Sequence, residues 1–484
     1  EAEAAAACGG GDTAEELALW LHRDGAEGAA GEAQRVAMSE CAPATGARGL
    51  VTTVAARSGD VLLRVPLAMC LTDLQPCDSC PDGAPWSVRV AARLLEERAK
   101  GDASAYAPFI ASLPWGRVTT PLQMGWDDTQ AIQWAHVRQE LYELDWLLNH
   151  WYEEYRQRND AAEDGKATPA TPVPALLGDF EAALTLVHSR TFLACVEEGG
   201  SNASPWFARV LVPLGDMINH DGVAHNTAWT YEDDGLAGKA MVFRATRDLL
   251  AGEEILADYG HQCIDDLFTY YGFVPRGAPA DAAPLFGAPI EALEWWLFAR
   301  GQEENEAALE RANALLAWME GGGHDAAADV ARSGQDTAAG GGKDATKGLR
   351  VHIGGSVDQQ LLEAFVALEL ACDAGPGEAA SEAEVSKALL GEAHAMVKRR
   401  CRELLQAAPS SLREDLAALG EGPQGVNSAC AFADEAELPV EAGATKLPQE
   451  AREALSAAEE SVARLNAAKK IVLCEVLANA EIAL

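Results

Sequence analysis

Residues 211–220 read LVPLGDMINH, and residues 252–260 read GEEILADYG. Between these segments, residues 227–231 and 239–245 favour β-strands, and the Asp-Asp-Gly sequence that begins at Asp233 is typical of a hairpin turn. An apolar run thus leads to an Asn-His pair, a hairpin follows, and a second strand leads to a tyrosine. Each piece alone is common, because most Asn-His pairs are ordinary turns and most strand-end tyrosines pack in a core. The ordered combination is far more specific.

This combination resembles the C-terminal half of a SET domain, the fold of one large class of protein methyltransferases. Residues 267–274, which read LFTYYGFV, are similar to the segment that closes that fold. The spacing is most similar to the branch that includes the Rubisco large-subunit lysine methyltransferase and the actin histidine methyltransferase. The resemblance implies an α+β fold, in which a SET-domain β core with a knot-like closure and a helical insert is followed by an all-α C-terminal domain.

Periodicity and composition place these parts along the chain. The SET domain is predicted at residues 14–284, with the helical insert at about residues 85–187. From Val137 to Tyr155, apolar residues recur at alternating steps of four and three, which predicts a long amphipathic helix packed into a core. Residues 160–174 contain three prolines and are predicted to form a loop.

The ends of the SET domain carry their own signals. Residues 47–51 and 61–66 favour strands, and the Gly-Asp turn at Gly59 predicts that they pair as a hairpin. The Ala- and Pro-rich segment 278–289 predicts a domain boundary. Beyond it, residues 285–484 are predicted to form the helical substrate-binding domain that the resemblance implies, interrupted by a flexible segment at residues 321–348.

Composition limits the partners and the compartment. A net charge of −38 argues against binding to nucleic acid, and no apolar run is long enough for a membrane span. The eleven cysteines are scattered and odd in number, which predicts reduced thiols in an intracellular protein, in the chloroplast or the cytoplasm. The close pair Cys77 and Cys80 lacks further ligands at suitable spacing, so we expect no metal. We also expect a monomer.

The resemblance implies S-adenosylmethionine as the cofactor. The family's Gly-x-Gly element matches residues 47–49, with Ala47 in place of the first glycine, and its Ser-Arg-x-Phe motif matches residues 189–192. Arg190 also fits a cation that stabilises a helix C-terminus, and Tyr271 and Phe273 also fit core packing. The predicted cofactor-binding residues are Ala47, Arg48, Gly49, Arg190, Asn219, His220, Tyr271 and Phe273.

The chemistry of methyl transfer makes Tyr259 the predicted catalytic residue. In-line transfer from a sulfonium to an amine needs a neutral nucleophile and close alignment. A lysine of ordinary pKa, ~10.4, must first lose a proton, which a narrow and partly desolvated channel favours. The hydroxyl of Tyr259 can form the wall of that channel and orient the amine. The predicted substrate-binding residues are Phe192, Gly215 and Asp258.

Lysine is the preferred target residue. In the resembled histidine methyltransferase, the position of Phe192 is a polar amide and that of Gly215 is a tryptophan. An apolar Phe192 suits an aliphatic lysine better than an imidazole. We therefore expect a protein substrate that bears a target lysine, such as the Rubisco large subunit or another non-histone protein. One alternative is histidine methylation. The other is an inactive SET-like binding module, which is favoured only by Ala47 and Arg48.

Overall fold

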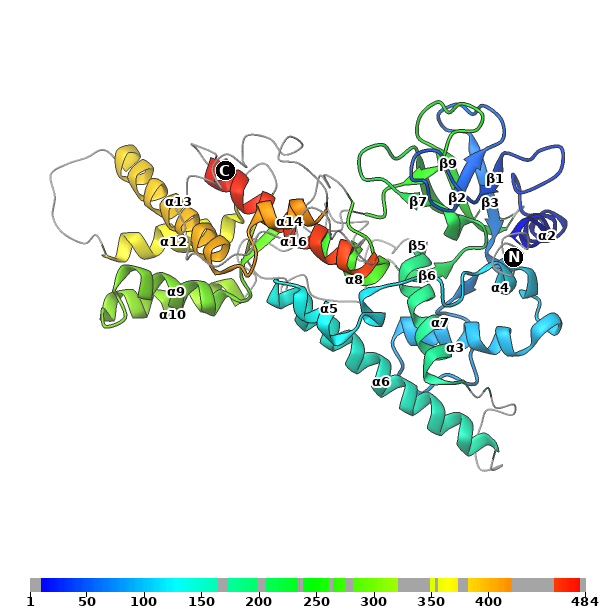
Figure 1. The fold of residues 1–484 in the computed structure, drawn as a ribbon, viewed down its shortest axis with the longest axis horizontal. Coiled ribbons are helices and arrows are strands. Elements are labelled where there is room, and N and C mark those ends of the chain that lie inside the picture. Colours follow the sequence, from blue (N-terminus) through cyan, green and yellow to red (C-terminus); the bar gives the residue numbers. More distant parts are fainter. Residues whose placement is uncertain are drawn as a thin grey trace, which may run out of the picture.

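The chain has a strand-rich part and a helical part, which lie on opposite sides of Figure 1. The computed structural model describes residues 10–163, 173, 175–197, 206–233, 235, 238–260, 264–275, 282–320, 349–352, 356–372, 382–419 and 457–478. Within this described part, no helix combines the length and the apolar character that crossing a membrane requires.

The helices are α2 (Gly10–Arg23), α3 (Trp86–Ala99), α4 (Ala107–Ser112), α5 (Trp126–Ala131), α6 (Ala135–Glu163), α7 (Leu177–Arg190), α8 (Ile264–Tyr271), α9 (Pro289–Arg300), α10 (Glu306–Glu320), α12 (Gln359–Cys372), α13 (Glu382–Ala407), α14 (Leu412–Ala418) and α16 (Ala457–Ala478). The strands are β1 (Val36–Ser39), β2 (Gly49–Thr52), β3 (Val61–Pro66), β4 (Leu71–Thr72), β5 (Thr191–Glu197), β6 (Trp206–Leu211), β7 (Asn219–His220), β8 (Thr227–Asp233), β9 (Lys239–Ala245), β10 (Leu256–Ala257), β11 (Ala282–Phe286) and β12 (Leu349–His352).

A five-stranded sheet in the order β3-β9-β8-β10-β7 forms the centre of the strand-rich part. Its β8 and β9 are antiparallel neighbours, which confirms the predicted hairpin. The short β10 pairs in parallel with β7, so that Leu256 lies opposite Asn219 and Ala257 opposite His220. Because parallel neighbours run in the same direction, the residues that follow the two strands emerge together. This pairing brings the Asn-His segment and the tyrosine segment side by side.

The predicted hairpin between residues 47–51 and 61–66 is wrong. Strand β2 pairs with β1, and β3 pairs with β9, so the two strands belong to different sheets. The chain between them bonds to a distant segment instead, since the Gly59 N–H donates to the Ala245 carbonyl at 2.8 Å and Ala56 exchanges hydrogen bonds with Leu249. These long-range bonds satisfy the backbone groups that a hairpin would have used.

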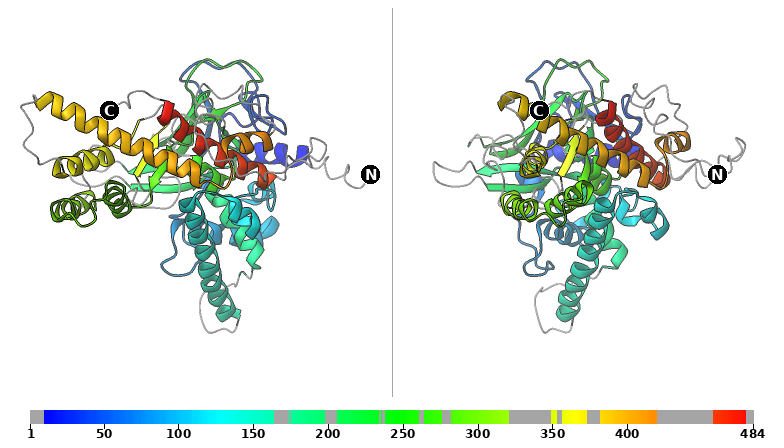
Figure 2. Two further views of the ribbon diagram at one scale, coloured as in Figure 1. Left: turned by 60° about the vertical axis from the view of Figure 1, so that its left-hand side comes forward. Right: turned by 90° about the vertical axis from the view of Figure 1, so that its left-hand side faces the viewer.

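The insert consists of α3 to α7, and its longest helix is α6, which projects away from the rest in Figures 1 and 2. The apolar face predicted for α6 is buried as expected, but its residues pack in two different cores. Val137, Leu141 and Leu144 pack with the C-terminal helices, whereas Leu148 and Tyr155 pack in the N-terminal core. The helix continues to Glu163, so it includes the start of the predicted loop, and most of the rest of that loop lies outside the described residues.

The C-terminal part is helical, with one small sheet in addition. Strands β11 and β12 pair antiparallel, and all five residues of β11 are buried within the segment predicted as a boundary. The apolar core around β11 includes Ile264 and Phe268 of α8 as well as Trp296 and Phe365. Residues on both sides of the predicted boundary between residues 284 and 285 therefore share one apolar core. The division of the chain into two domains at this boundary stays a prediction. The segment predicted as flexible, residues 321–348, lies outside the described residues.

A buried charge cluster joins the two parts. The Asp265 carboxylate on α8 lies 3.1 Å from Nε2 of His136 on α6 and 3.0 Å from Nζ of Lys469 on α16. Burial alone would raise the pKa of the Asp265 carboxyl, but Lys469 and His136 hold it well below its usual range. A depressed pKa means that this carboxylate stabilises the fold above the pKa of an unfolded aspartate, ~3.9, and that the stabilisation is lost on further acidification.

We expect His136→Ala to lower the free energy of unfolding by about 1.5–3 kcal/mol at neutral pH, the usual contribution of a hydrogen bond to a charged group. Urea unfolding followed by circular dichroism measures this change. Because the pKa of the folded Asp265 carboxyl lies well below its usual range, the difference from the unsubstituted chain should persist down to the pKa of an ordinary aspartate, ~3.9, and shrink only on further acidification. A difference that already disappears between pH 7 and pH 5 would contradict this explanation.

Candidate active site

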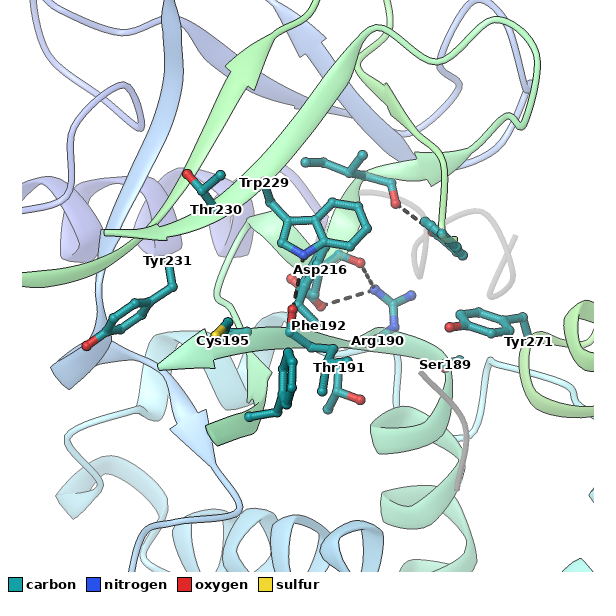
Figure 3. A pocket seen from close by; sticks show the side chains of 15 residues that line it. Ser189, Arg190, Thr191, Phe192, Cys195, Asp216, Trp229, Thr230, Tyr231 and Tyr271 are labelled. Atoms are coloured by element: carbon teal, nitrogen blue, oxygen red, sulfur yellow. Dashed lines mark hydrogen bonds and ion pairs between the residues drawn. The ribbon is translucent and has the colours of Figure 1, made fainter. Parts of the chain in front are cut away.

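A cavity of about 270 Å³ lies between strands from two sheets. Residues 189–195, from the end of α7 into β5, form one wall, and Trp229, Thr230 and Tyr231 of β8 form the opposite wall, as Figure 3 shows. Phe207, Asp216, Ile218, Tyr259 and Tyr271 complete the lining. The cavity is therefore lined by four of the predicted site residues, namely Arg190, Phe192, Tyr259 and Tyr271.

Arg190 and Asp216 form an ion pair at this cavity. The Arg190 Nη1 donates to the Asp216 Oδ2 at 3.1 Å and to the Asp216 carbonyl at 2.9 Å. The Asp216 side chain is fully buried, and that of Arg190 is 18% exposed. Burial raises the pKa of the Asp216 carboxyl, and the Arg190 charge opposes that rise. Within the described part of the chain, Arg190 Nε and Asp216 Oδ1 are buried without a hydrogen-bond partner, so the cavity offers a donor and an acceptor to a polar ligand.

Asp216 is held by a strained turn. It lies in a short 3₁₀ helix, Gly215–Met217, that directly follows Leu214. Leu214 has a φ of 66°, and among the described residues it is the sole non-glycine residue with a positive φ. A bulky side chain rarely adopts this conformation, which costs on the order of 1–3 kcal/mol and persists where the surroundings enforce it. Such strain is typical of functional sites.

Tyr259 lies at the meeting point of the Asn-His and tyrosine segments. Its hydroxyl donates to the Ile218 carbonyl at 2.6 Å, and its backbone N–H donates to Nδ1 of His220 at 3.1 Å. Gly260 follows with a φ of 104°, a conformation that glycine adopts readily, so the chain turns directly after the tyrosine. Burial raises the pKa of the Tyr259 hydroxyl, so it stays protonated at neutral pH.

Aromatic rings surround Tyr259. Its ring centroid is 5.1 Å from that of His220 and 5.1 Å from that of Tyr271, and His220 is 5.9 Å from Phe273. The His220 Nδ1 accepts a hydrogen bond, so the imidazole is neutral, and burial lowers the pKa of His220 in agreement with this state. The structure thus brings together four predicted residues in one aromatic cluster.

The predicted Gly-x-Gly element is held by a buried carboxylate. Glu254 accepts hydrogen bonds from the backbone N–H groups of Ala44 and Thr45 at 2.8 and 2.9 Å, and from the Asn219 Nδ2 at 2.9 Å. The Asn219 Nδ2 also lies 3.2 Å from the Arg48 carbonyl. Asn219, from the Asn-His segment, and Glu254, from the tyrosine segment, therefore hold the loop of residues 44–48 in place.

Close packing explains why one glycine of the element is present and the other is replaced. A Cβ at Gly49 would lie 2.5 Å from the Asn219 Nδ2, which is too close for any side chain. Ala47 is exposed, so its methyl group has room. Arg48, between them, donates from Nη2 to the Ser112 carbonyl at 3.2 Å, and its Nε is buried without a hydrogen-bond partner in the described part.

The three predicted substrate-binding residues occupy different places. Phe192 lines the cavity and packs edge-on against Trp229, with ring centroids 5.1 Å apart. Gly215 is buried outside the lining, and a Cβ there would lie 2.6 Å from the Phe243 ring, so this glycine makes room for a core phenylalanine. Asp258 also lies outside the lining, and its Oδ1 accepts from the Gly260 N–H at 3.1 Å.

Three residues of the site, Asp216, Trp229 and Glu254, were not predicted from the sequence. Asp216 and Glu254 lie inside the two quoted segments, and Asp216 is a carboxylate within an apolar run, which is a signal for a buried functional group. Trp229 gave no such signal, because one tryptophan in a strand is ordinary. In the described part of the chain, no three His, Cys, Asp or Glu side chains gather in an arrangement that could hold a metal ion.

Comparison with known proteins shows what this part of the chain resembles. Residues 47–260 match the family model of the SET domain, and a search of curated proteins found no match. Residues 47–260 are therefore similar to SET domains.

Solved structures show the fold that the chain shares. A SET domain of LSMT bound to lysine and AdoHcy has 15% sequence identity and a TM-score of 0.60, and the match covers 97% of this chain and 90% of that one. Rubisco LSMT bound to AdoMet has 14% identity and a TM-score of 0.58, with coverage of 96% and 91%. Rubisco LSMT bound to sinefungin and monomethyllysine has 15% identity and a TM-score of 0.59, with coverage of 96% and 90%. The fold of nearly the whole chain is that of these structures, which confirms the α+β prediction.

Proposed function

We propose that this protein transfers a methyl group from S-adenosylmethionine to a lysine side chain of a protein substrate. The observation that carries the proposal is the position of Tyr259, whose buried hydroxyl lines the cavity beside the Arg190–Asp216 pair. The SET family match and the ligands named for the similar LSMT structures support it.

The residues of the site fit the cofactor. The unpartnered Nε of Arg190 suits its carboxylate, and the Asn-His segment with the loop at residues 44–49 supplies backbone and amide groups for its other polar atoms. The rings of Tyr271 and Phe273 offer apolar surface. When bound, the cofactor would supply an electrophilic methyl group on a positively charged sulfur.

The cavity walls would favour the neutral form of the lysine amine. Phe192 and Trp229 provide an apolar lining that suits the aliphatic chain and disfavours a charged ammonium, so the amine loses its proton to water more readily. These walls would hold the neutral nitrogen in line with the methyl group that the bound cofactor would supply. The Tyr259 oxygen has donated its hydrogen to Ile218, so it is free to accept a hydrogen bond from the amine and to orient its lone pair.

Binding and transfer can be tested separately. Calorimetry with S-adenosylmethionine tests the site, and incubation of a cell extract with cofactor labelled at the methyl group, followed by mass spectrometry, identifies the modified protein and residue. We expect one cofactor per chain and label on lysine. Label on histidine would replace the lysine assignment, binding without transfer would indicate an inactive SET-like module, and absence of binding would overturn the proposal.

We expect Gly49→Ala to weaken S-adenosylmethionine binding roughly tenfold, because the new Cβ displaces the Asn219 amide and removes about one hydrogen bond from the loop. Calorimetry measures the affinity. Gly391→Ala is the matched control, and its affinity should stay unchanged because Gly391 lies on α13 and a Cβ there would have no atom within 4 Å. Equal affinities of the two variants would mean that the loop does not contact the cofactor.

A further inference from the structure

Four aromatic side chains form an exposed ridge on the insert, which we call the aromatic ridge: Trp126, Tyr142, Trp146 and His150. Trp126 is 68% exposed, Trp146 is 64% exposed and Tyr142 is 41% exposed. The last three lie four residues apart on α6, so they share one face of the helix. Trp126 joins them from α5. This face is separate from the apolar face of α6 that the two cores bury.

The rings of the ridge are ordered by contacts with each other. Trp126 stacks on Tyr142, with centroids 6.4 Å apart and planes at 29°. Trp146 stacks on His150 at 4.7 Å and 8°. The Tyr142 hydroxyl also accepts from the Gln130 Nε2 at 2.9 Å. Exposed rings held in place in this way form a contact surface that loses little conformational freedom on binding.

The surroundings of the ridge are acidic. Asp127 and Asp128 follow Trp126 in the first turn of α5, and the exposed Glu143 and Asp145 lie next to Tyr142 and Trp146 on α6. The nearest cation on α6 is Arg138, which donates to the Ile132 carbonyl. A partner with positive charge would therefore be attracted to this face, whereas nucleic acid and anionic lipid would be repelled.

Other tryptophans of this chain show which group such rings accept. The Arg98 guanidinium lies 4.1 Å from the Trp115 ring centroid, and that of Arg209 lies 4.6 Å from the Trp86 ring. No cation of the described part lies over Trp126 or Trp146. Arginine suits such rings better than lysine, because its flat guanidinium stacks on the ring and its N–H groups still reach a neighbouring carboxylate.

We propose that the aromatic ridge binds an arginine-bearing basic segment of a partner protein. The guanidinium groups stack on Trp126 and Trp146, and Glu143 and Asp145 accept their hydrogen bonds. The site is distinct from the cavity at Tyr259, and the inference does not depend on methyl transfer.

A labelled peptide tests this inference on the full chain. The probe is a fluorescent peptide of alternating Arg, Gly and Ser without lysine, and fluorescence anisotropy measures its binding. The matched probe carries citrulline in place of arginine, which keeps the shape and removes the charge. We expect the arginine peptide to bind about tenfold more tightly than the citrulline peptide, and rising salt to weaken its binding. Equal binding of the two peptides, or no binding of either, would overturn the inference.

Variants locate the site. Trp146→Ala should weaken binding of the arginine peptide about tenfold, and Trp146→Phe should weaken it less because a ring remains. The pair Glu143→Gln and Asp145→Asn should lower both affinity and salt dependence. Phe298→Ala and Glu294→Gln are the matched controls, since Phe298 is 72% exposed and Glu294 is also exposed, and both lie on α9, away from the ridge. Equal losses in the ridge and control variants would overturn the assignment to the ridge, and unchanged thermal unfolding of each variant shows that its fold is intact.

Discussion

Tyr259→Phe is expected to lower the rate of methyl transfer by roughly a hundredfold or more, which corresponds to about 2–4 kcal/mol in the transition state. The substitution keeps the ring that packs against His220 and Tyr271 and removes only the hydroxyl. That oxygen lines the cavity, and it has already given its hydrogen to the Ile218 carbonyl, so it can act only as an acceptor toward a substrate amine. Single-turnover methylation at saturating cofactor measures the effect.

Cofactor affinity separates catalysis from packing at this position. The affinity of Tyr259→Phe for S-adenosylmethionine should change little, because the hydroxyl would face the reacting methyl and not the nucleoside. Tyr271→Phe is the matched comparison, since Tyr271 also lines the cavity and its ring lies 5.1 Å from Tyr259. Equal rates for the unsubstituted protein and Tyr259→Phe would assign Tyr259 to packing and make Tyr271 the next candidate.

Arg190→Met is expected to lower the free energy of unfolding by about 3–5 kcal/mol at neutral pH, because it leaves the Asp216 carboxylate buried without its cation. The same change removes the predicted partner of the cofactor carboxylate, so S-adenosylmethionine binding should also be lost. Urea unfolding and calorimetry measure the two effects. A variant as stable as the unsubstituted protein would mean that the pair does not stabilise the fold.

The pH dependence of this variant has a definite sign. Burial already raises the pKa of Asp216, and removing Arg190 raises it further, so the folded state binds a proton more tightly than the unfolded state does. A raised carboxyl pKa destabilises the fold at pH values above it and ceases to do so as the pH falls through it. The loss of unfolding free energy in Arg190→Met should therefore shrink as the pH falls through the raised pKa of Asp216 toward that of an unfolded aspartate, ~3.9.

A double variant isolates the pair. Arg190→Met combined with Asp216→Asn removes both charges and should recover part of the stability that the single change loses. It should not recover cofactor binding, because Arg190 is still absent. If the loss of unfolding free energy is the same in the single and double variants at every pH, the loss comes from packing of the Arg190 side chain and not from its charge.

Predictions about the candidate site came from local order in the sequence, and the structure brings many of these residues together. Arg190, Phe192, Tyr259 and Tyr271 meet at one cavity, although they come from distant positions in the chain. They meet because two sheets and the ends of α7 and α8 adjoin the same cavity, and their roles in binding and catalysis stay predictions. The sequence was less informative about Gly215. In the structure, the absence of a Cβ at Gly215 makes room for Phe243.

The sequence by itself determined the elements and their order, because burial patterns, turn residues and motif spacing are local properties. The alternating pattern of α6 predicted a helix with one buried face, and the Asp-Asp-Gly turn predicted the β8–β9 hairpin. The family resemblance added the fold and named Tyr259, Asn219 and His220.

Only the tertiary structure decided which distant segments meet. It separated β2 from β3, divided the buried face of α6 between two cores, and placed the Glu254 carboxylate on a loop 209 and 210 residues earlier in the chain. Such contacts depend on which unsatisfied backbone groups, charges and apolar faces lie nearest once the chain is compact. A local pattern shows that a group needs a partner, and the closed fold determines which partner it finds.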